Sequence, residues 1–414
     1  MISSFFIRNY RSILELKVDF SFAEGKAPNG YLETENYHFF SPSNNDKDDK
    51  RRYVACLAFY GANASGKSNI LNALRDFRGL TVESEDKFGI KSKLENLFYP
   101  NRLNKKFSTT VFEIAFFAEQ CEYSYRIEYD NQEIKMETLL KNGETLFSIE
   151  GHARDFKKIA TKEYSAELLQ KTFEVECLDN KIYQRQPFLL KVRSRFPGLS
   201  RDVCNAFDYI DRIIMFGNNN PKELGLRSDV SHFHEDFSKM VEIVKKLDVD
   251  LSWVGISMLD DSKAKGKKIG KIKTYHRDIN NEEIEFDFID ESRGTQILLG
   301  GLISWIRVAI EGGRPIIVDE LDASLHPLLL KEIIHMFKNK SYNSRKAQII
   351  FSTHTTDILD YGLLKLSDVA IVDKTLQEGT VIKRLCDFDG VRNTTDFRKQ
   401  YLEGRFSGIP FSYI

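Results

Sequence analysis

The chain has 414 residues, of which 42% are hydrophobic and 29% charged, and these proportions are those of ordinary globular proteins rather than of disordered or collagen-like chains. With 60 basic and 61 acidic residues the formal net charge is −1, which excludes a uniformly basic nucleic-acid coat but not a local basic patch. The length favours more than one domain.

The cysteines and the apolar segments indicate a cellular compartment. The cysteines are scattered and form no C-x-x-C pair, which argues against a disulfide framework or a zinc cage and fits a reducing environment; they are Cys56, Cys121, Cys177, Cys204 and Cys386. The first residues, MISSFFIRNYRS, lack the apolar core and cleavage site of a secretory signal. The apolar run at 297–310 is too short for a membrane span of about 20 residues. We therefore expect a cytoplasmic protein with no membrane partner.

The first 250 residues contain strand patterns followed by a helical stretch. Strand patterns lie at 2–7, 14–20, 53–60, 109–118 and 122–129. The run 53–60 is apolar throughout, as expected for a strand buried on both faces, and a helix pattern follows it. Residues 150–250 have helical spacing without a sustained heptad, so we expect a mainly helical insertion and no long coiled coil.

Strands and helices alternate in the remainder of the chain. Strand patterns at 251–259, 284–289, 315–318 and 347–351 are interleaved with helix patterns at 297–311, 327–338 and after His354. This alternation is typical of a parallel α/β sheet. We therefore predict an α/β fold with a first lobe at 1–149, a mainly helical insertion at 150–250 and a second lobe at 251–414.

A glycine-rich loop between the strand 53–60 and its helix is the strongest motif. Residues 61–68 fit G-x-x-x-x-G-K-[ST] in full. Backbone N–H groups of such a loop and the following helix N-terminus point at phosphate, Lys67 would neutralise the β- and γ-phosphates, and Ser68 would ligate Mg²⁺. A chance glycine turn is the alternative, which the strand–loop–helix context disfavours. The predicted nucleotide-binding residues are Gly61, Ala62, Asn63, Ala64, Ser65, Gly66, Lys67, Ser68 and Asn69.

An acidic pair follows the strand 315–318. Asp319 and Glu320 come at its carboxyl end, where α/β sheets place their ligands. In combination with the upstream loop, Asp319 would hold Mg²⁺ and Glu320 would be the base that deprotonates the attacking water. Without that loop, the pair would be interpreted as a solvated strand end.

Two further motifs extend the pattern. His354 ends Ser352-Thr-His after the strand 347–351, where a histidine can reach a γ-phosphate; a capping or surface histidine is the alternative. Ser292 and Gly294 lie ahead of an apolar helix and would offer an anion-binding N-terminus, with a plain N-cap as the alternative. The predicted catalytic residues are Glu320, His354 and Lys67.

The order of these motifs resembles that of ABC-type ATPase heads. The glycine-rich loop is followed by Ser-x-Gly-x-Gln, by Asp-Glu with Leu321-Asp-Ala-Ser-Leu-His-Pro327, and by Ser-Thr-His. The start, Phe6-Ile-Arg-Asn-Tyr-Arg-Ser12, is similar to the first strand of the SMC/RecF/OLD branch. The loop 61–69 and the ending Tyr401-Leu-Glu-Gly-Arg-Phe-Ser-Gly-Ile-Pro410 resemble stand-alone AAA family ATPases of the RloA/AbiL type, to which the ATPase subunit of the PARIS anti-phage system is similar.

The resemblance implies a two-lobed ABC-ATPase head that uses ATP and Mg²⁺ as cofactors. It also implies a homodimer, or a higher even oligomer, with two ATP molecules sandwiched between heads. Ser292 and Gly294 of one subunit would complete the site of the other, although Glu291, Arg293 and Thr295 depart from the usual signature. Arg8 and Arg11 would contact phosphate or adenine, or have structural roles, and Gln120 is a candidate magnesium ligand between the lobes.

Two residue clusters allow both a functional and a structural interpretation. Residues 263–273 contain six lysines and would form a hairpin tip, either against a phosphate backbone or, as we favour, solvated. His232-Phe-His234-Glu-Asp236 has metal-ligating residue types, but no second cluster supports it and a helix start is favoured.

We expect an ATP-binding and hydrolysing sensor or switch subunit of a bacterial anti-phage defence (abortive infection) system that controls a separate effector. No room for an OLD-type nuclease domain is expected after His354. The alternative is a RecF/SMC-like DNA-repair or DNA-maintenance ATPase that clamps DNA. A nuclease hidden in the insertion is a third hypothesis.

Overall fold

The computed structural model describes most of the chain. The described residues are 1–22, 38–40, 51–83, 93–103, 105–151, 153–161, 164–171, 185–196, 198–217, 251–260, 268–323, 325–359, 362–392 and 395–409. The predictions for His232–Asp236, and for the part of the lysine-rich segment before residue 268, therefore lie outside the described residues.

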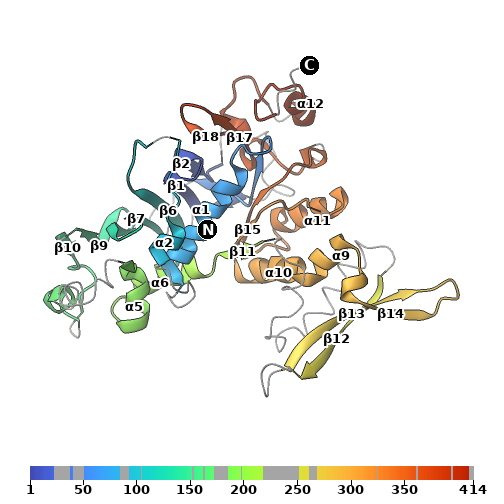
Figure 1. The fold of residues 1–414 in the computed structure, drawn as a ribbon, viewed down its shortest axis with the longest axis horizontal. Coiled ribbons are helices and arrows are strands. Elements are labelled where there is room, and N and C mark those ends of the chain that lie inside the picture. Colours follow the sequence, from blue (N-terminus) through green and yellow to red (C-terminus); the bar gives the residue numbers. More distant parts are fainter. Residues whose placement is uncertain are drawn as a thin grey trace.

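One mixed sheet of 13 strands organises the fold (Figure 1). Its strand order is β10-β9-β8-β7-β6-β1-β2-β18-β17-β5-β16-β15-β11. The antiparallel part contains β1 (Ile2–Tyr10), β2 (Ile13–Asp19), β6 (Thr110–Ala118), β7 (Cys121–Tyr129), β8 (Ile134–Lys141), β9 (Glu144–Glu150) and β10 (Ala153–Asp155). The parallel part contains β5 (Cys56–Tyr60), β11 (Ile214–Phe216), β15 (Pro315–Val318), β16 (Gln348–Ser352) and β17 (Val369–Thr375).

A narrow seam joins the two parts. β18 (Gly379–Arg384) forms a hairpin with β17 and meets β2 through a single residue pair, Gly379 with Ile13. The predicted α/β class is thus confirmed, with a parallel sheet and an antiparallel β lobe in one continuous layer.

Each face of the parallel sheet has its own core. In β15, Ile316 and Val318 pack in one hydrophobic cluster and Ile317 in the other, because successive side chains of a strand point to opposite faces. The first cluster is covered by α10 (Ile303–Gly312) and α11 (Pro327–Lys338). The second is covered by α1 (Lys67–Val82), α2 (Lys93–Leu97), α5 (Phe188–Arg195) and α6 (Arg201–Asp211).

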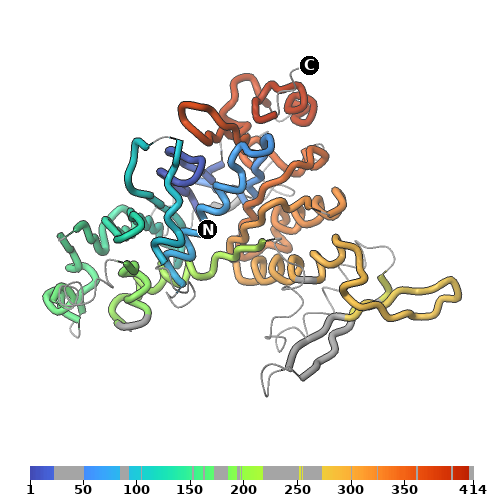
Figure 2. Tube along the Cα trace, viewed as in Figure 1, coloured from blue at the N-terminus to red at the C-terminus, as the bar shows by residue number. Residues whose placement is uncertain are grey.

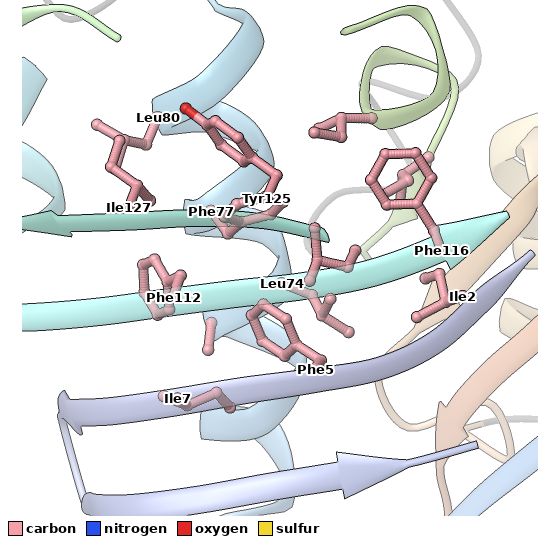
Figure 3. Packing of buried hydrophobic residues seen from close by; sticks show 14 of the residues in the cluster. Ile2, Phe5, Ile7, Leu74, Phe77, Leu80, Phe112, Phe116, Tyr125 and Ile127 are labelled. Carbon is pink, nitrogen blue, oxygen red and sulfur yellow. The ribbon is translucent and has the colours of Figure 1, made fainter. Parts of the chain in front are cut away.

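Aromatic rings fasten α1 to the antiparallel strands. Phe5 of β1, Phe77 of α1 and Phe112 of β6 are fully buried, and their ring centroids lie 5.8–6.1 Å apart (Figure 3). Burial of one such ring contributes about 1.5–3 kcal/mol. The helix that begins at the glycine-rich loop is therefore held by both parts of the sheet.

A separate three-stranded antiparallel sheet follows residue 250. It consists of β12 (Leu251–Asp260), β13 (Lys268–Arg277) and β14 (Glu283–Asp287), and it lies at the opposite end of the molecule from β9 and β10 (Figure 1). Figure 2 shows the same separation for β14. The turn η4 (Phe288–Asp290), the short helix α9 (Arg293–Ile297) and the π-helical turn η5 (Leu298–Leu302) lead from it into α10. A small pair, β3 (His38–Phe40) with β4 (Arg52–Val54), completes the strands.

The C-terminal part of the chain lies beside β17. It contains short 3-10 turns at η6 (Asp357–Leu359), η7 (Leu366–Asp368) and η8 (Leu385–Asp387), then α12 (Phe397–Leu402). The predicted helix after His354 is wrong for the described residues up to 359, which form the three-residue turn η6 instead. The strand at 315–318 and the helix at 327–338 are confirmed.

The domain division stays a prediction. Within 150–250, α5 and α6 are helical as expected, whereas β10 and β11 join the main sheet at its two edges. Residues 172–184 and 218–250 lie outside the described part. Across the described residues, no helix has the length and apolarity that a membrane span requires.

Candidate nucleotide site

The glycine-rich loop connects the buried strand β5 to α1 in a space that only glycine fits. Gly61 has φ +155°, and a Cβ there would lie 2.2 Å from the Val372 carbonyl oxygen. Gly66 has φ +113°, and its Cβ would lie 2.1 Å from Thr380 Oγ1. Both positions therefore require glycine on grounds of backbone conformation and of space. The loop is fixed against the β17–β18 hairpin at both ends.

Lys67 is folded over the loop. Its ammonium group donates hydrogen bonds to the carbonyl oxygens of Gly61 at 2.7 Å and Ala62 at 3.0 Å. Burial lowers the pKa of Lys67, and the carboxylates of Asp319, Asp322 and Glu320 oppose that shift. The effect of burial on the Lys67 pKa thus outweighs that of the three carboxylates. The Lys67 ammonium is therefore suited to bind an anion.

The start of α1 has the character of a phosphate site. This 16-residue helix begins after Gly66 with no side-chain cap and no acidic residue in its first turn. Its first N–H groups and the helix dipole therefore favour an anion. The buried hydroxyl of Ser65 has no hydrogen-bond partner among the described residues, whereas Asn63 and Ala64 are exposed at the loop tip. The loop has polar capacity left for phosphate oxygens.

Asp319 of the acidic pair is hydrogen-bonded to the end of the glycine-rich loop. Ser68 Oγ donates to Asp319 Oδ1 at 3.2 Å, and Ser352 Oγ donates to the same oxygen at 2.5 Å. The Glu320 N–H donates to Ser352 Oγ at 2.7 Å. Glu320 itself is exposed and has φ +51°, a left-handed conformation uncommon for a residue with a Cβ. The Glu320 backbone is thus held by Ser352 while its side chain lies at the surface.

The arrangement fits a magnesium ion. Mg²⁺ prefers oxygen ligands and keeps several waters, and the hydroxyl of Ser68 and the carboxylate of Asp319 are oxygen donors that already face each other. Among the described residues there is no cluster of three or more His, Cys, Asp or Glu side chains that would form an all-protein metal cage. A magnesium ion here would therefore depend on phosphate and water for its remaining ligands.

Asp322 organises the loop that carries His354. Asp322 Oδ2 accepts hydrogen bonds from the backbone N–H of His354 at 2.9 Å and of Thr355 at 3.0 Å, and from the Thr355 hydroxyl at 3.0 Å. The His354 side chain is exposed. Its backbone is therefore fixed while its ring is free to meet a ligand at the carboxyl ends of the strands.

Asn69 has a structural partner. Its side-chain amide donates to Ser12 Oγ at 2.6 Å, and Ser12 Oγ lies 2.7 Å from Thr380 Oγ1. Thr380 Oγ1 in turn donates to the carbonyl of Ser65 at 3.1 Å. This chain of hydrogen bonds ties the β1–β2 turn, the β17–β18 hairpin and the glycine-rich loop together.

Ser292 and Gly294 belong to a different part of the molecule. Ser292 is exposed and caps α9, accepting from the Thr295 N–H at 3.2 Å. α9 lies beside α10 and next to the β12–β14 sheet (Figure 1). Glu291, which departs from the usual signature, accepts from His276 Nε2 at 2.7 Å and from the Thr274 hydroxyl. The signature-like segment is therefore anchored to β13 rather than joined to the Lys67–Asp319 cluster.

The weaker candidates fall elsewhere. Gln120 lies in the β6–β7 turn and lines a cavity with Gly313 and Lys346, which precede β15 and β16. That is the amino edge of the parallel strands, opposite the edge at which the glycine-rich loop begins, so Gln120 is wrong as a magnesium ligand in this subunit. Arg8 pairs with Glu128 at 3.2 Å, and Arg11 lies over the Tyr99 ring at 4.7 Å.

The structure adds residues that the sequence did not single out. Ser352 was seen only as part of a histidine motif, and its bridge from Asp319 to Glu320 depends on the parallel pairing of β15 with β16. Asp322 was seen only as part of a resemblance. Thr380 carried no local signal, because its role arises from a contact with Gly66 across more than 300 residues of sequence.

A glycine-rich loop between a buried parallel strand and a helix, with an acidic pair two strands away, defines a P-loop nucleotide-binding protein. Residues 56–360 match the family described as "AAA domain, putative AbiEii toxin, Type IV TA system". The chain belongs to this family of AAA domains. A comparison with curated proteins gave no matching relative.

Solved SMC heads are among the similar structures. One is described as "Crystal structure of the SmcHead bound to the C-winged helix domain of ScpA"; it has 15% identity and a TM-score of 0.44, with 92% of this chain and 97% of that chain covered. The SMC head domain from Thermotoga maritima has 13% identity and a TM-score of 0.42, with 92% and 98% covered.

Proposed function

We propose that the chain binds ATP with Mg²⁺, hydrolyses it, and uses the nucleotide state as a switch that controls a separate effector in bacterial anti-phage defence. One cluster carries the ATPase part of the proposal. In it, the hydroxyls of Ser68 and Ser352 both donate to Asp319 Oδ1, and the buried ammonium of Lys67 lies beside them. The match to the family described as "AAA domain, putative AbiEii toxin, Type IV TA system" supports the defence role.

The residues divide the chemistry between them. Lys67 exchanges its bonds to the Gly61 and Ala62 carbonyls for bonds to the β- and γ-phosphates, and the uncapped N-terminus of α1 receives a phosphate through its N–H groups. Bound Mg²⁺ would neutralise charge that develops on the phosphate oxygens. Ser68 and Asp319 would hold it, the latter through water.

Glu320 is the proposed base. Its carboxylate is exposed, so it can meet a water molecule in line with the γ-phosphorus and take its proton. His354, on the adjacent strand end, would contact the γ-phosphate and thereby distinguish ATP from ADP. Because Asp322 fixes the backbone of the His354 loop, this contact would be made without reordering the loop.

The proposal includes a homodimer or higher even oligomer in the cytoplasm. The segment with the exposed Ser292 and the half-buried Gly294 would complete the site of a second subunit, in keeping with its position outside the Lys67–Asp319 cluster. Hydrolysis would then report assembly, and the γ-phosphate would act as the switch. Within this proposal the chain is an ATPase of the RloA/AbiL type, similar to the ATPase subunit of PARIS.

The first experiment compares phosphate release by the wild-type protein and by Glu320→Gln. We expect the variant to retain ATP binding and to lose about 10²- to 10⁴-fold in turnover, the usual contribution of a general base. Glu378→Gln changes an exposed glutamate on the β17–β18 turn and serves as the matched control. Undiminished turnover in Glu320→Gln would remove Glu320 from the base role.

The second experiment tests the switch. The Glu320→Gln form is expressed from its own locus with its neighbouring genes, purified with Mg-ATP and weighed by native mass spectrometry. An even number of these chains together with a second polypeptide is the expected result. Multiples of this chain alone, or with duplex DNA, would replace the effector-control proposal by a DNA-clamping ATPase.

A further inference from the structure

The C-terminal segment 397–409 lies directly against the glycine-rich loop. Tyr401 of α12 is 8% exposed, and its ring meets Tyr60 edge-on with centroids 5.8 Å apart. Tyr60 is the last residue of β5, immediately before Gly61. α12 therefore lies over the point where the strand becomes the loop, beside the β17–β18 hairpin (Figure 1).

The Tyr401 hydroxyl connects two backbone segments. It donates a hydrogen bond to the carbonyl oxygen of Gly408 at 3.2 Å. Burial raises the pKa of Tyr401, and the nearby backbone of Gly61 opposes that shift. The Tyr401 hydroxyl thus fixes the carbonyl of Gly408 beside the first residue of the loop.

Gly408 brings the backbone of the segment onto the loop. It has φ +68°, and a Cβ there would lie 2.7 Å from Ile371 Cγ2 and 3.5 Å from Gly61 Cα. Its N–H is directed at the Asp373 carboxylate, at 3.4 Å. Because Gly61 also abuts the Val372 carbonyl, the first residue of the loop is enclosed between β17 and the C-terminal segment.

The same helix also touches the loop that carries His354. Arg398 of α12 pairs with Asp357 at 2.9 Å. The Tyr60 hydroxyl donates to the Thr355 carbonyl at 3.1 Å, and Thr355 is held by Asp322. Contacts from α12 therefore reach both sides of the nucleotide site, the phosphate loop through Tyr401 and the histidine loop through Arg398.

We propose that Tyr401 and Gly408 are positioning residues of the nucleotide site, which hold Gly61 in the conformation that accepts phosphate. This inference rests on the proposed nucleotide binding and assigns a role to the segment Tyr401–Gly408. A loop held in its bound conformation before the ligand arrives loses less conformational entropy on binding, so the contacts contribute to affinity. Without them, the Gly408 carbonyl loses its donor, the segment no longer encloses Gly61, and the loop has more conformations to lose on binding.

The decisive variant is Tyr401→Phe, which removes the hydroxyl and keeps the ring against Tyr60. Tyr129→Phe is the matched control, because the Tyr129 hydroxyl also donates to a buried carbonyl, that of Leu97 at 2.9 Å, away from the loop. We expect Tyr401→Phe to weaken ATP binding about three- to tenfold, the effect of one hydrogen bond. KM for ATP should rise in proportion, and kcat should change less than KM.

A readout that needs no nucleotide separates this inference from the proposed function. Amide hydrogen exchange of residues 61–66 in the ligand-free protein should be faster in Tyr401→Phe than in wild type, and unchanged in Tyr129→Phe. If wild type binds no ATP but this exchange difference is present, the proposed function fails and the positioning role stands. If wild type binds ATP and Tyr401→Phe matches it in both affinity and exchange, the positioning role is overturned.

Gly408→Ala supplies an independent test. Gly143→Ala, at φ +80° with no atom within 4 Å of the new Cβ, is its control for backbone strain alone. We expect both alanines to lower the melting temperature, and Gly408→Ala alone to weaken ATP binding. Equal affinity in the two variants would show that Gly408 has no positioning role.

Discussion

The hydroxyl of Ser352 lies 2.5 Å from Asp319 Oδ1, and the same hydroxyl accepts the N–H of Glu320 at 2.7 Å. One side chain from β16 therefore sets the position of both members of the acidic pair that follows β15. The pair is oriented by the neighbouring strand rather than by its own turn.

Ser352→Ala should lower ATP turnover by about 10- to 100-fold, the usual cost of losing a residue that orients a metal-binding carboxylate. The alanine leaves the Glu320 N–H without its acceptor and frees Asp319 to rotate. The Mg²⁺ concentration that gives half-maximal turnover should also rise. The measurement is steady-state phosphate release across a magnesium titration.

The control for Ser352→Ala is Ser148→Ala. Ser148 of β9 makes a comparable hydroxyl contact, with Thr138 at 3.2 Å, in the antiparallel part of the sheet. Wild-type magnesium dependence in Ser352→Ala would show that Asp319 keeps its orientation without the bridge.

Asp322→Ala should impair hydrolysis more than ATP binding. The substitution leaves the N–H groups of His354 and Thr355 without their shared acceptor, so the histidine loop shifts. A displacement of about 1 Å in a positioned group can cost up to about 100-fold in rate. Single-turnover hydrolysis and equilibrium binding, measured side by side, separate the two effects.

Asp130→Ala is the matched control for Asp322→Ala. Asp130 likewise accepts two backbone N–H groups, from Gln132 and Glu133, but in the β7–β8 turn. A comparable loss of turnover in both variants would mean that the loss reflects stability rather than the histidine loop.

The lowered pKa of Lys67 predicts that the affinity for ATP depends on pH. Burial lowers its pKa, so the protonated form that attracts phosphate is lost at a lower pH than for an ordinary lysine. The nucleotide's own phosphates, with a second pKa of about 6, are fully ionised well below this range. We expect the dissociation constant for ATP to increase while the pH is still below 10.5, the ordinary pKa of lysine.

Titration calorimetry in buffers of different ionisation enthalpy checks the Lys67 prediction. Proton uptake on ATP binding should grow toward high pH, since bound phosphate restores the ammonium form. An affinity that stays constant up to pH 10.5 would contradict it.

Breaking the ion pair of Lys338 with Asp368 should lower the free energy of unfolding substantially. Both side chains are 0% exposed, and Asp368 also accepts the Lys365 N–H at 2.8 Å. Lys338→Met leaves a buried carboxylate uncompensated, which costs about 3–5 kcal/mol. Urea unfolding should show a lower midpoint, whereas Lys158→Met, in an exposed pair with Glu144, should leave it unchanged.

The parts of the fold that were predictable are those with local signals. The strand at 315–318 is a continuous apolar run, and the helix at 327–338 has a proline at its first position and apolar residues at helical spacing. The three residues of β11 are apolar too, but they follow α6 so closely that the sequence does not separate them from that helix. Ile214–Phe216 is a strand because it pairs with β15, about 100 residues later in the chain.

In the site, too, only the residues of a contiguous motif could be grouped from the sequence. Gly61–Ser68 carry a contiguous motif, so their grouping could be derived from sequence, and the structure adds a hydrogen bond from Ser68 to Asp319. The contact of Tyr401 with the strand that leads into the loop could not be derived, because it joins the rings of Tyr401 and Tyr60, which lie more than 300 positions apart. The missing helix after His354 has a similar cause, since Asp322 holds that backbone in an extended loop.

The seam between β2 and β18 gives the phosphate loop a mechanical role. In the strand ladder, β2 and β18 are joined by a single residue pair, and Arg384 of β18 adds hydrogen bonds to Asp19 and Ser21. Ser12 and Thr380, on the two sides of this seam, bond to each other and, through Asn69 and Ser65, to α1 and to the loop. A phosphate bound in the loop would therefore lie against the joint between the parallel and antiparallel parts of the sheet and would restrain both.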